Sequence, residues 1–266
     1  MIRILLLGFS MTLMYSAPLV LSAMGGVVSM RSGVDNIGLE GMMTIGAFGA
    51  TTVGYFSGNP WLGFFMGGVA GMLLALLHGI VSISLKGNQI ISGIAINFIG
   101  PGAAIFLSRL LFDGATQTYT VSNKIPKLFA SLGVTNPILR NADIDATVLV
   151  ALLSVVALWY FLYYTKAGLR VRACGEHPAA ADTVGVNVSL VRYLCVLASG
   201  FLSGLGGAAY TLAIISNFTP TVISGQGFIA LAAVIFGNWR PIGAALGCLL
   251  FGFAQALIIM LAGSFI

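Results

Sequence analysis

The sequence predicts an all-α protein built into a membrane, as a polytopic bundle of about seven hydrophobic spans plus one half-helix. Three observations predict this fold class. Of the 266 residues, 58% are hydrophobic and only 7% are charged, whereas a soluble domain carries about 25% charged residues. The chain contains 35 glycines, and small residues let membrane helices approach closely. Apolar runs long enough to cross a bilayer recur from one end of the chain to the other.

The spans follow from the length of these runs, since about 20 mostly apolar residues cross about 30 Å of hydrocarbon. The first run, 4–29, is too long and uninterrupted for a cleaved signal peptide, so we expect it to be a span. A run rich in Gly and Ala, 38–56, follows the break Arg31-Ser32-Gly33 and nearly reaches this length. The other full-length runs are 61–85, 88–112, 146–165, 193–215 and 241–263.

One apolar run is too short to span. Residues 226–237 lie between Ser224-Gly225-Gln226-Gly227 and Asn238-Trp239-Arg240-Pro241. Twelve helical residues reach only about 18 Å. Because lipid leaves bare backbone groups without hydrogen-bond partners, such a half-helix must be packed among its neighbours.

Two polar connections divide the chain, which we treat as a single transmembrane domain over 1–266. We expect 113–145 to form an external loop and 166–192 a cytoplasmic loop. This orientation places seven basic residues inside and five outside, which favours it only slightly under the positive-inside rule. The inside set is Arg31, Lys86, Lys166, Arg170, Arg172, Arg192 and Arg240, and the outside set is Arg3, Arg109, Lys124, Lys127 and Arg140.

Several other functions are excluded or disfavoured. The net charge of +5 comes from basic residues scattered singly between apolar runs, so no nucleic-acid-binding stripe forms. The three cysteines share no metal or disulfide spacing. We find no paired carboxylates and no nucleophile beside a base, so we do not expect an enzyme. A G-x-x-x-x-G-K-[ST] phosphate loop is also missing, so this chain does not bind ATP by that route.

The loop after residue 165 has the features of a docking element. Pro178 at a first helical position is followed by Ala179, Ala180 and Ala181, which favours a short helix. Gly185 then supplies a stop. A brief helix between two spans, with charges at both ends, suits a groove on a partner protein better than an ordinary solvated loop does.

This loop resembles the coupling helix of ABC importer permeases, whose alanine–alanine–glycine signature is echoed by Ala180-Ala181-x-x-x-Gly185. Four segments are similar to the branch that imports ribose-type sugars and nucleosides. Where ribose permeases usually show Gly-Gly-x-Asp-Leu-Ser, this chain has Ser32-Gly33-Val34-Asp35-Asn36-Ile37, which looks more like the nucleoside permeases. The four segments are 31–41, 89–97, 176–188 and 227–237.

The resemblance implies a permease in a bacterial plasma membrane that forms half of a dimeric translocation pore. It implies three partners: an ABC ATPase with two nucleotide-binding domains, a second permease (like or unlike), and an extracellular substrate-binding lipoprotein. This subunit would hold no cofactor, because the ATPase binds ATP and Mg²⁺. The chain begins at the helix that ribose permeases place second; if the chain is complete, its N-terminus is expected outside. The residues expected to couple to the ATPase are Gly175, Glu176, Pro178, Ala180, Ala181 and Gly185.

Polar residues inside spans are the candidate substrate contacts, because each is costly unless it faces a cavity or a partner. The two Ser-Gly breaks, at 32–36 and 224–227, hint at an internal repeat, and duplicated transporters place their substrate path at paired breaks. We expect Asn36, Asn97, Ser224 and Gln226 to line this path.

These residues also have structural interpretations. Asn97 is equally compatible with an interhelical clamp, and an external loop explains Ser224 and Gln226 equally well. Glu40, which follows the first break, is expected to cap the exposed amides of the next helix, Gln255 to bond between helices, and His78 to be a packing residue.

The favoured substrate is a purine-type nucleoside, with a ribose-type sugar or riboflavin as alternatives. An ion-coupled secondary transporter is a rival, but it needs titratable groups deep in the spans. The only titratable residues found within the spans for such a role are Glu40 and His78, and both lie near span ends rather than deep in them.

Overall fold

The computed structural model describes residues 2–131 and 143–262, and the regular structure within them is helical. The helices are α1 (Ile2–Arg31), α2 (Leu39–Ser57), α3 (Pro60–Gly79), α4 (Gln89–Leu111), α5 (Leu128–Ser131), α7 (Ala146–Tyr164), α8 (Lys166–Glu176), α9 (Pro178–Thr183), α10 (Val188–Ala209), α11 (Gln226–Phe236) and α12 (Pro241–Ala262). Two π-helical turns, η1 (Ile80–Ser84) and η2 (Tyr210–Ile215), extend α3 and α10. The prediction of an all-α helical bundle is confirmed.

Among the described helices, six are long and apolar enough to cross a membrane: α1, α3 with η1, α4, α7, α10 with η2, and α12. The predicted count of about seven included α2, which has 19 residues and is about 28 Å long. It fails on apolarity, because it is rich in Gly and Thr. Most of its residues are buried, so protein rather than lipid surrounds it.

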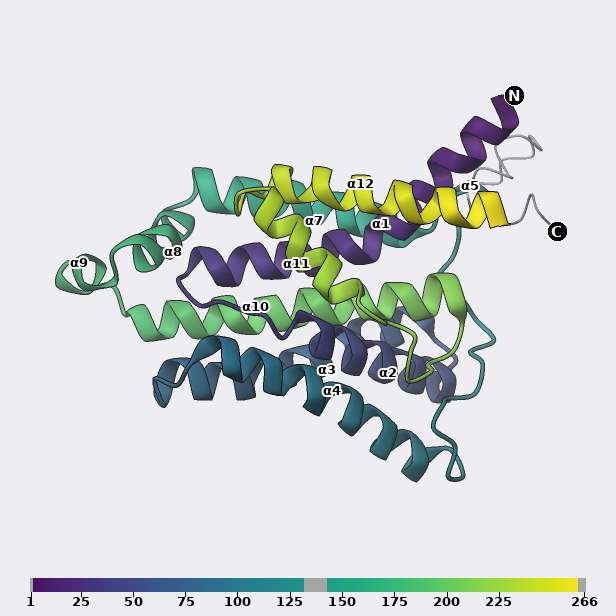
Figure 1. Ribbon diagram of the computed structural model, residues 1–266, viewed down its shortest axis with the longest axis horizontal. Helices are drawn as coiled ribbons and strands as arrows, with labels where there is room; N and C mark the ends of the chain where they lie inside the picture. The colour runs from purple at the N-terminus through teal and green to yellow at the C-terminus, as the bar shows by residue number, and fades with distance from the viewer. Residues whose placement is uncertain (1, 132–142, 263–266) are drawn as a thin grey trace.

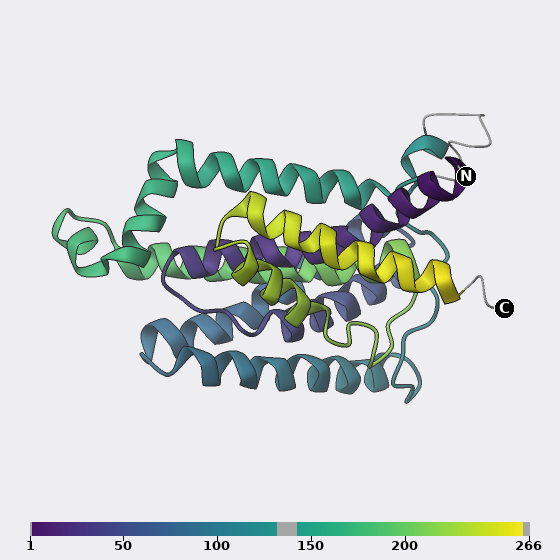
Figure 2. The same ribbon diagram turned by 45° about the horizontal axis from the view of Figure 1, so that its top comes forward.

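The centre of the bundle is formed by α1, α2 and α10, with α3 and α4 on one side and α12 and α7 on the other (Figures 1 and 2). Glycines permit this packing. A Cβ atom at Gly207 would overlap the backbone of Met43, and one at Gly46 would overlap Gly204. The interior helices therefore touch backbone to backbone, as expected for small residues in membrane bundles.

The predicted half-helix is confirmed as α11, whose 11 residues extend about 16 Å. It packs against α1, α2 and α12 in the middle of the bundle (Figure 1). The turn that joins it to α12 is tight, since a Cβ atom at Gly237 would overlap Ala244.

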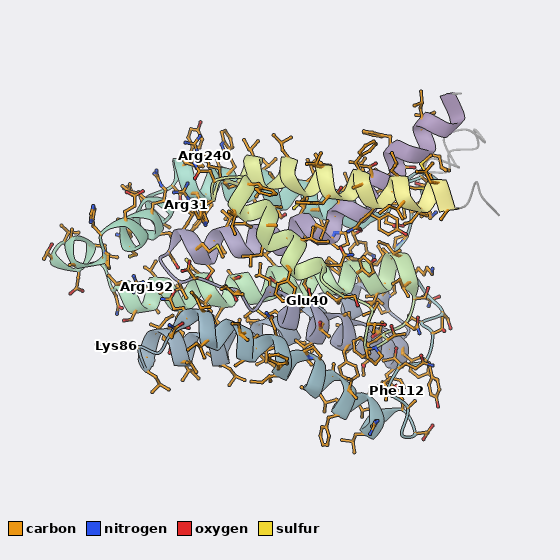
Figure 3. All side chains as sticks on the ribbon, viewed as in Figure 1. Arg31, Glu40, Lys86, Phe112, Arg192 and Arg240 are labelled. Carbon is orange, nitrogen blue, oxygen red and sulfur yellow. The ribbon has the colours of Figure 1, made fainter. Side chains whose placement is uncertain are left out.

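The two ends of the bundle differ. α8 and α9 protrude at one end, where Arg31, Lys86, Arg192 and Arg240 also lie (Figure 3). α5 and the start of α1 lie at the opposite end (Figure 1). The loops 113–145 and 166–192 are therefore on opposite sides, as predicted, although residues 132–142 of the first lie outside the described part. α8 itself was not predicted; the Thr165 hydroxyl caps it by accepting from the Gly168 amide at 3.0 Å.

Candidate functional site

The two breaks predicted from the sequence meet inside the bundle. Glu40, in the first turn of α2, accepts hydrogen bonds of 2.6 Å from the amides of Gly225 and Gly227, where α11 begins. A carboxylate stabilises a helix N-terminus, because the amides there have no intrahelical partner. Glu40 was expected to cap the helix that follows the first break, but it lies in that helix and caps α11 instead, because the packing of the bundle brings the N-terminus of α11 against its carboxylate.

Asn97 holds the other side of the first break. Its Oδ1 accepts from the Gly41 amide at 2.9 Å, and its Nδ2 donates to the Ile37 carbonyl at 3.0 Å. Gly100, one turn further along α4, has no room for a Cβ atom against Gly41. Of the two roles considered, these contacts make Asn97 a clamp between α4 and the start of α2.

Asn36 is fully buried within the break. Its Nδ2 donates to Ser199 Oγ on α10 at 2.8 Å, and its Oδ1 accepts from the Gly38 amide at 3.0 Å. The exposed backbone of the break is thus supported by side chains, as a membrane interior requires. A substrate would not reach Asn36 in this conformation of the chain.

The second break presents the more accessible polar groups. Ser224 is exposed and has a positive φ of 30°. Gln226 is partly exposed, and its Oε1 accepts from Gln255 Nε2 on α12 at 2.9 Å. The interhelical bond expected of Gln255 is confirmed. Of the four residues predicted to line a path, Ser224 is exposed, Gln226 and Asn97 are partly exposed, and Asn36 is buried.

The predicted short helix is present as α9, which starts at Pro178 and is followed by Gly185 with a φ of +82°, while its role in docking stays a prediction. Ala181 is buried, whereas Pro178 and Ala180 are exposed. Val184, at the tip, is 78% exposed although it is apolar and lies outside the spans. A groove of about 550 Å³ runs beside α9. The loop therefore presents an exposed apolar residue beside a groove at the end of the bundle that carries α8.

The coupling loop is fastened to the first break. A Cβ atom at Gly175 would overlap the backbone of Arg31, so α8 ends directly against the end of α1. Arg192, at the start of α10, donates from Nε to the Ser32 carbonyl at 3.2 Å and from Nη2 to the Cys174 carbonyl at 3.3 Å. A continuous set of contacts thus joins α9 to the breaks that start α2 and α11.

Sequence reasoning missed Arg192, counting it only toward the charge asymmetry of the loops. An arginine that directly follows the loop and precedes an apolar run was the available signal.

Burial raises the pKa of the Cys174 thiol. Cys174, Cys195 and Cys248 are all free and buried. No group of three or more candidate metal ligands is found in the described ranges, and His78 is buried with Nδ1 3.0 Å from Ser92 Oγ, as expected of a packing residue.

An α-helical bundle with broken helices in its interior and a protruding helix at one end defines a multi-pass membrane transport subunit. The chain belongs to the family described as the permease component of branched-chain amino acid transport systems, which matches residues 8–265. The membership predicted from the coupling loop is confirmed.

Three relatives cover most of this chain. A guanosine ABC transporter permease of Bacillus subtilis is 45% identical over 262 residues, which is 94% of this chain and 81% of the relative. A nucleoside ABC transporter permease of Lactococcus lactis subsp. cremoris is 41% identical over 257 residues, 93% of this chain and 80% of the relative. A putative glucose ABC transporter permease of Haloferax volcanii is 39% identical over 251 residues, 92% of this chain and 75% of the relative.

Proposed function

We propose that this chain is one permease subunit of an ABC importer that takes up nucleosides, with purine nucleosides as the favoured substrates. The observation that carries the proposal is the similarity to the guanosine and nucleoside permeases at 45% and 41% identity. The break Ser32–Ile37, which departs from the ribose pattern, points the same way.

The partners follow from the class. A cytoplasmic ATPase with two nucleotide-binding domains would bind ATP and Mg²⁺ and receive α9 in a groove on its surface. A second permease would complete the pore, and an extracellular binding lipoprotein would deliver the substrate. The contact residues on this chain are Gly175, Glu176, Pro178, Ala180, Ala181 and Gly185. Among them, Glu176, Pro178, Ala180 and Gly185 are exposed and free to contact a partner.

The contacts from α9 to the breaks suggest how a movement of the ATPase would be transmitted to the pore. A displacement of α9 would move α8, because the two are consecutive and short. α8 would then shift the first break through Gly175 and Arg192, and Glu40 would carry the movement to α11. Vectorial transport then needs only a different substrate affinity in the two states of the pore.

The substrate path would run past the second break, at Ser224 and Gln226, with Asn97 and Asn36 behind it. An uncharged, hydroxyl-rich nucleoside needs hydrogen-bonding groups and no counter-charge, and a hydroxyl with a carboxamide provides donors and acceptors. Glu40 is engaged by two amides. Its carboxylate is thus committed to holding the start of α11, so the proposal favours the importer over an ion-coupled transporter.

The test is uptake by cells that lack this gene but retain the rest of the transporter. Uptake of labelled guanosine should fall to background and return when the chain is restored. The glucose permease of Haloferax volcanii makes a sugar the second candidate. If these cells lost glucose or ribose uptake but kept guanosine uptake, that sugar, not a nucleoside, would be the substrate. Riboflavin uptake would be measured in the same cells to test the remaining alternative.

A further inference from the structure

A cleft that the transport path does not use opens at the end of the bundle that carries α8. It lies between the end of α7, α8 and the turn from α11 to α12, and its volume is about 970 Å³. Arg31 and Arg240 lie at this same end (Figure 3). A volume of this size is in the range of clefts that bind small molecules.

Positive charge gathers in the cleft. Its lining includes Arg31, Arg172 and Arg240 and a single carboxylate, Glu176. Arg31 donates from Nε to the Trp239 carbonyl at 2.8 Å, and the Arg172 guanidinium lies 5.3 Å from the centre of the Tyr163 ring. In the described part of the chain, none of the three guanidinium groups forms an ion pair with a carboxylate, so the cleft is cationic.

Arg172 is the most telling of these residues. Its Nε is buried and has no hydrogen-bond partner. A buried donor without a partner costs about 1–3 kcal/mol, and native structures rarely leave one unsatisfied. A planar guanidinium with free donors matches a phosphate or carboxylate group. The side chain is therefore poised for an anionic acceptor that enters the cleft.

The rest of the lining is aromatic and apolar. Trp159 and Tyr163 come from the last turns of α7, and Ile242 and Leu246 come from the first turns of α12. Ile242 is 49% exposed and Leu246 is 62% exposed on a helix long and apolar enough to span a membrane, so this wall is an uncovered apolar surface of the chain. Trp and Tyr are enriched where a membrane surface meets water. The cleft thus runs from a cationic end at the membrane surface to an apolar wall within the bilayer.

We propose that this cleft binds an anionic phospholipid, with the headgroup phosphate on Arg172, Arg240 and Arg31 and an acyl chain along Ile242 and Leu246. Basic pockets between membrane helices bind such headgroups. A free phosphate would satisfy the arginines but would leave the apolar wall unused, so the lipid accounts for both halves of the cleft. The lining includes none of residues 32–36 and 224–227, so the site does not depend on which solute is transported.

The experiment uses the full chain with its co-purifying subunits, reconstituted into vesicles of phosphatidylcholine. Trp61 and Trp239 are replaced by Phe, so that Trp159 is the single tryptophan of this chain, and tryptophan-free variants of the other subunits are used. A small fraction of brominated phosphatidylglycerol should quench Trp159 fluorescence more strongly than the same fraction of brominated phosphatidylcholine. Equal quenching by the two lipids would overturn the proposal.

Matched variants tie the effect to the cleft. The double variant Arg172→Gln with Arg240→Gln should lower the preference for phosphatidylglycerol by roughly thirtyfold, since each basic residue near a membrane surface contributes about 1 kcal/mol. Arg170→Gln, on α8 but outside the cleft lining, should leave the preference unchanged. Glu176→Gln should strengthen it, a gain that misfolding does not produce. An unchanged preference in the double variant would refute the site.

Inorganic phosphate distinguishes the two sources of the anion. Added at matched ionic strength, it should not displace brominated phosphatidylglycerol from Trp159. If phosphate abolished the lipid preference while sulfate-free salt at equal ionic strength did not, the cleft would be a soluble-phosphate site and the lipid assignment would be wrong.

Discussion

The carboxylate of Glu40 accepts a 2.6 Å hydrogen bond from the backbone amide of Gly227, 187 residues further along the chain. No room remains between them, since a Cβ atom on Gly227 would lie 2.8 Å from Glu40 Oε2 and would overlap the Glu40 backbone. The starts of α2 and α11 therefore form one unit, and the predictions begin there.

Replacing Glu40 by Gln should destabilise the chain. A neutral amide loses the charge-assisted bonds to Gly225 and Gly227, and a hydrogen bond to a charged group contributes about 1.5–3 kcal/mol. The unfolding midpoint in detergent should fall clearly. Asp182→Asn removes an exposed carboxylate on α9 and should leave the midpoint unchanged. Equal midpoints for Glu40→Gln and the parent would show that the cap contributes nothing.

Two glycines in α4 provide a matched pair for the packing of α4 on α2. A Cβ atom at Gly100 would overlap the Gly41 backbone, while one at Gly102 meets nothing within 4 Å. Gly100→Ala should cost about 1–3 kcal/mol through overpacking, whereas Gly102→Ala should be neutral or stabilising because Ala favours helix. Thermal unfolding of both variants in the same detergent would measure this, and equal effects would contradict the close crossing.

Gly185 and Gly58 provide a second pair, which tests the coupling role of α9. Both have positive φ, 82° and 68°, and a Cβ atom on either meets nothing within 4 Å. Each change to Ala should therefore cost a similar strain of about 1–2 kcal/mol. Only Gly185→Ala should also reduce substrate uptake, because it reshapes the docking loop, and Gly185→Glu should abolish uptake without preventing insertion. Equal uptake by Gly185→Ala and Gly58→Ala would remove the coupling assignment.

The orientation can be read with engineered cysteines, because the three native thiols are buried. Ala179→Cys is exposed on α9, and Ser57→Cys is exposed at the opposite end, where Gly58 accepts a bond from Asn123. In intact cells, a membrane-impermeant thiol reagent should label Ser57→Cys and spare Ala179→Cys. The reverse pattern would show that the coupling loop faces outward.

Asp145, which precedes α7, should make stability depend on pH. Burial raises its pKa to about 6, with Lys127 opposing and Asp143 adding to the shift, and its Oδ2 has no hydrogen-bond partner. The folded state then binds the proton more tightly than the unfolded state does. Stability from this group is therefore lost as pH rises from about 4 to about 6.

The measurement is the difference in unfolding midpoint between the parent chain and Asp145→Asn across this range. Asn imitates the protonated acid, so the parent's midpoint should fall relative to the variant's as the pH rises. A difference that is flat or rises with pH would contradict the burial of an uncompensated carboxylate.

The sequence predicted well wherever a local signal sufficed. Pro178, three alanines and Gly185 specify α9 by capping and helix propensity alone. The short run between two breaks specified α11 by its length. Surroundings mattered more for α2: its burial frees it from the apolarity that lipid demands, so length and composition alone leave it outside the six clear candidates. Asn97 could not be assigned to clamp or path, because its partners Gly41 and Ile37 lie more than 50 residues away.

Composition and the length of apolar runs alone determined that this protein is a membrane helix bundle, because crossing a bilayer requires a fixed length and satisfied backbone groups. Its local motifs alone determined the family. Only the tertiary structure decided that Glu40 caps α11, that Arg192 joins the coupling loop to the first break, and that Arg31, Arg172 and Arg240 share one cleft. These relationships depend on how helices distant in sequence pack together. That packing is the sum of many weak contacts between helices, so no single segment specifies it.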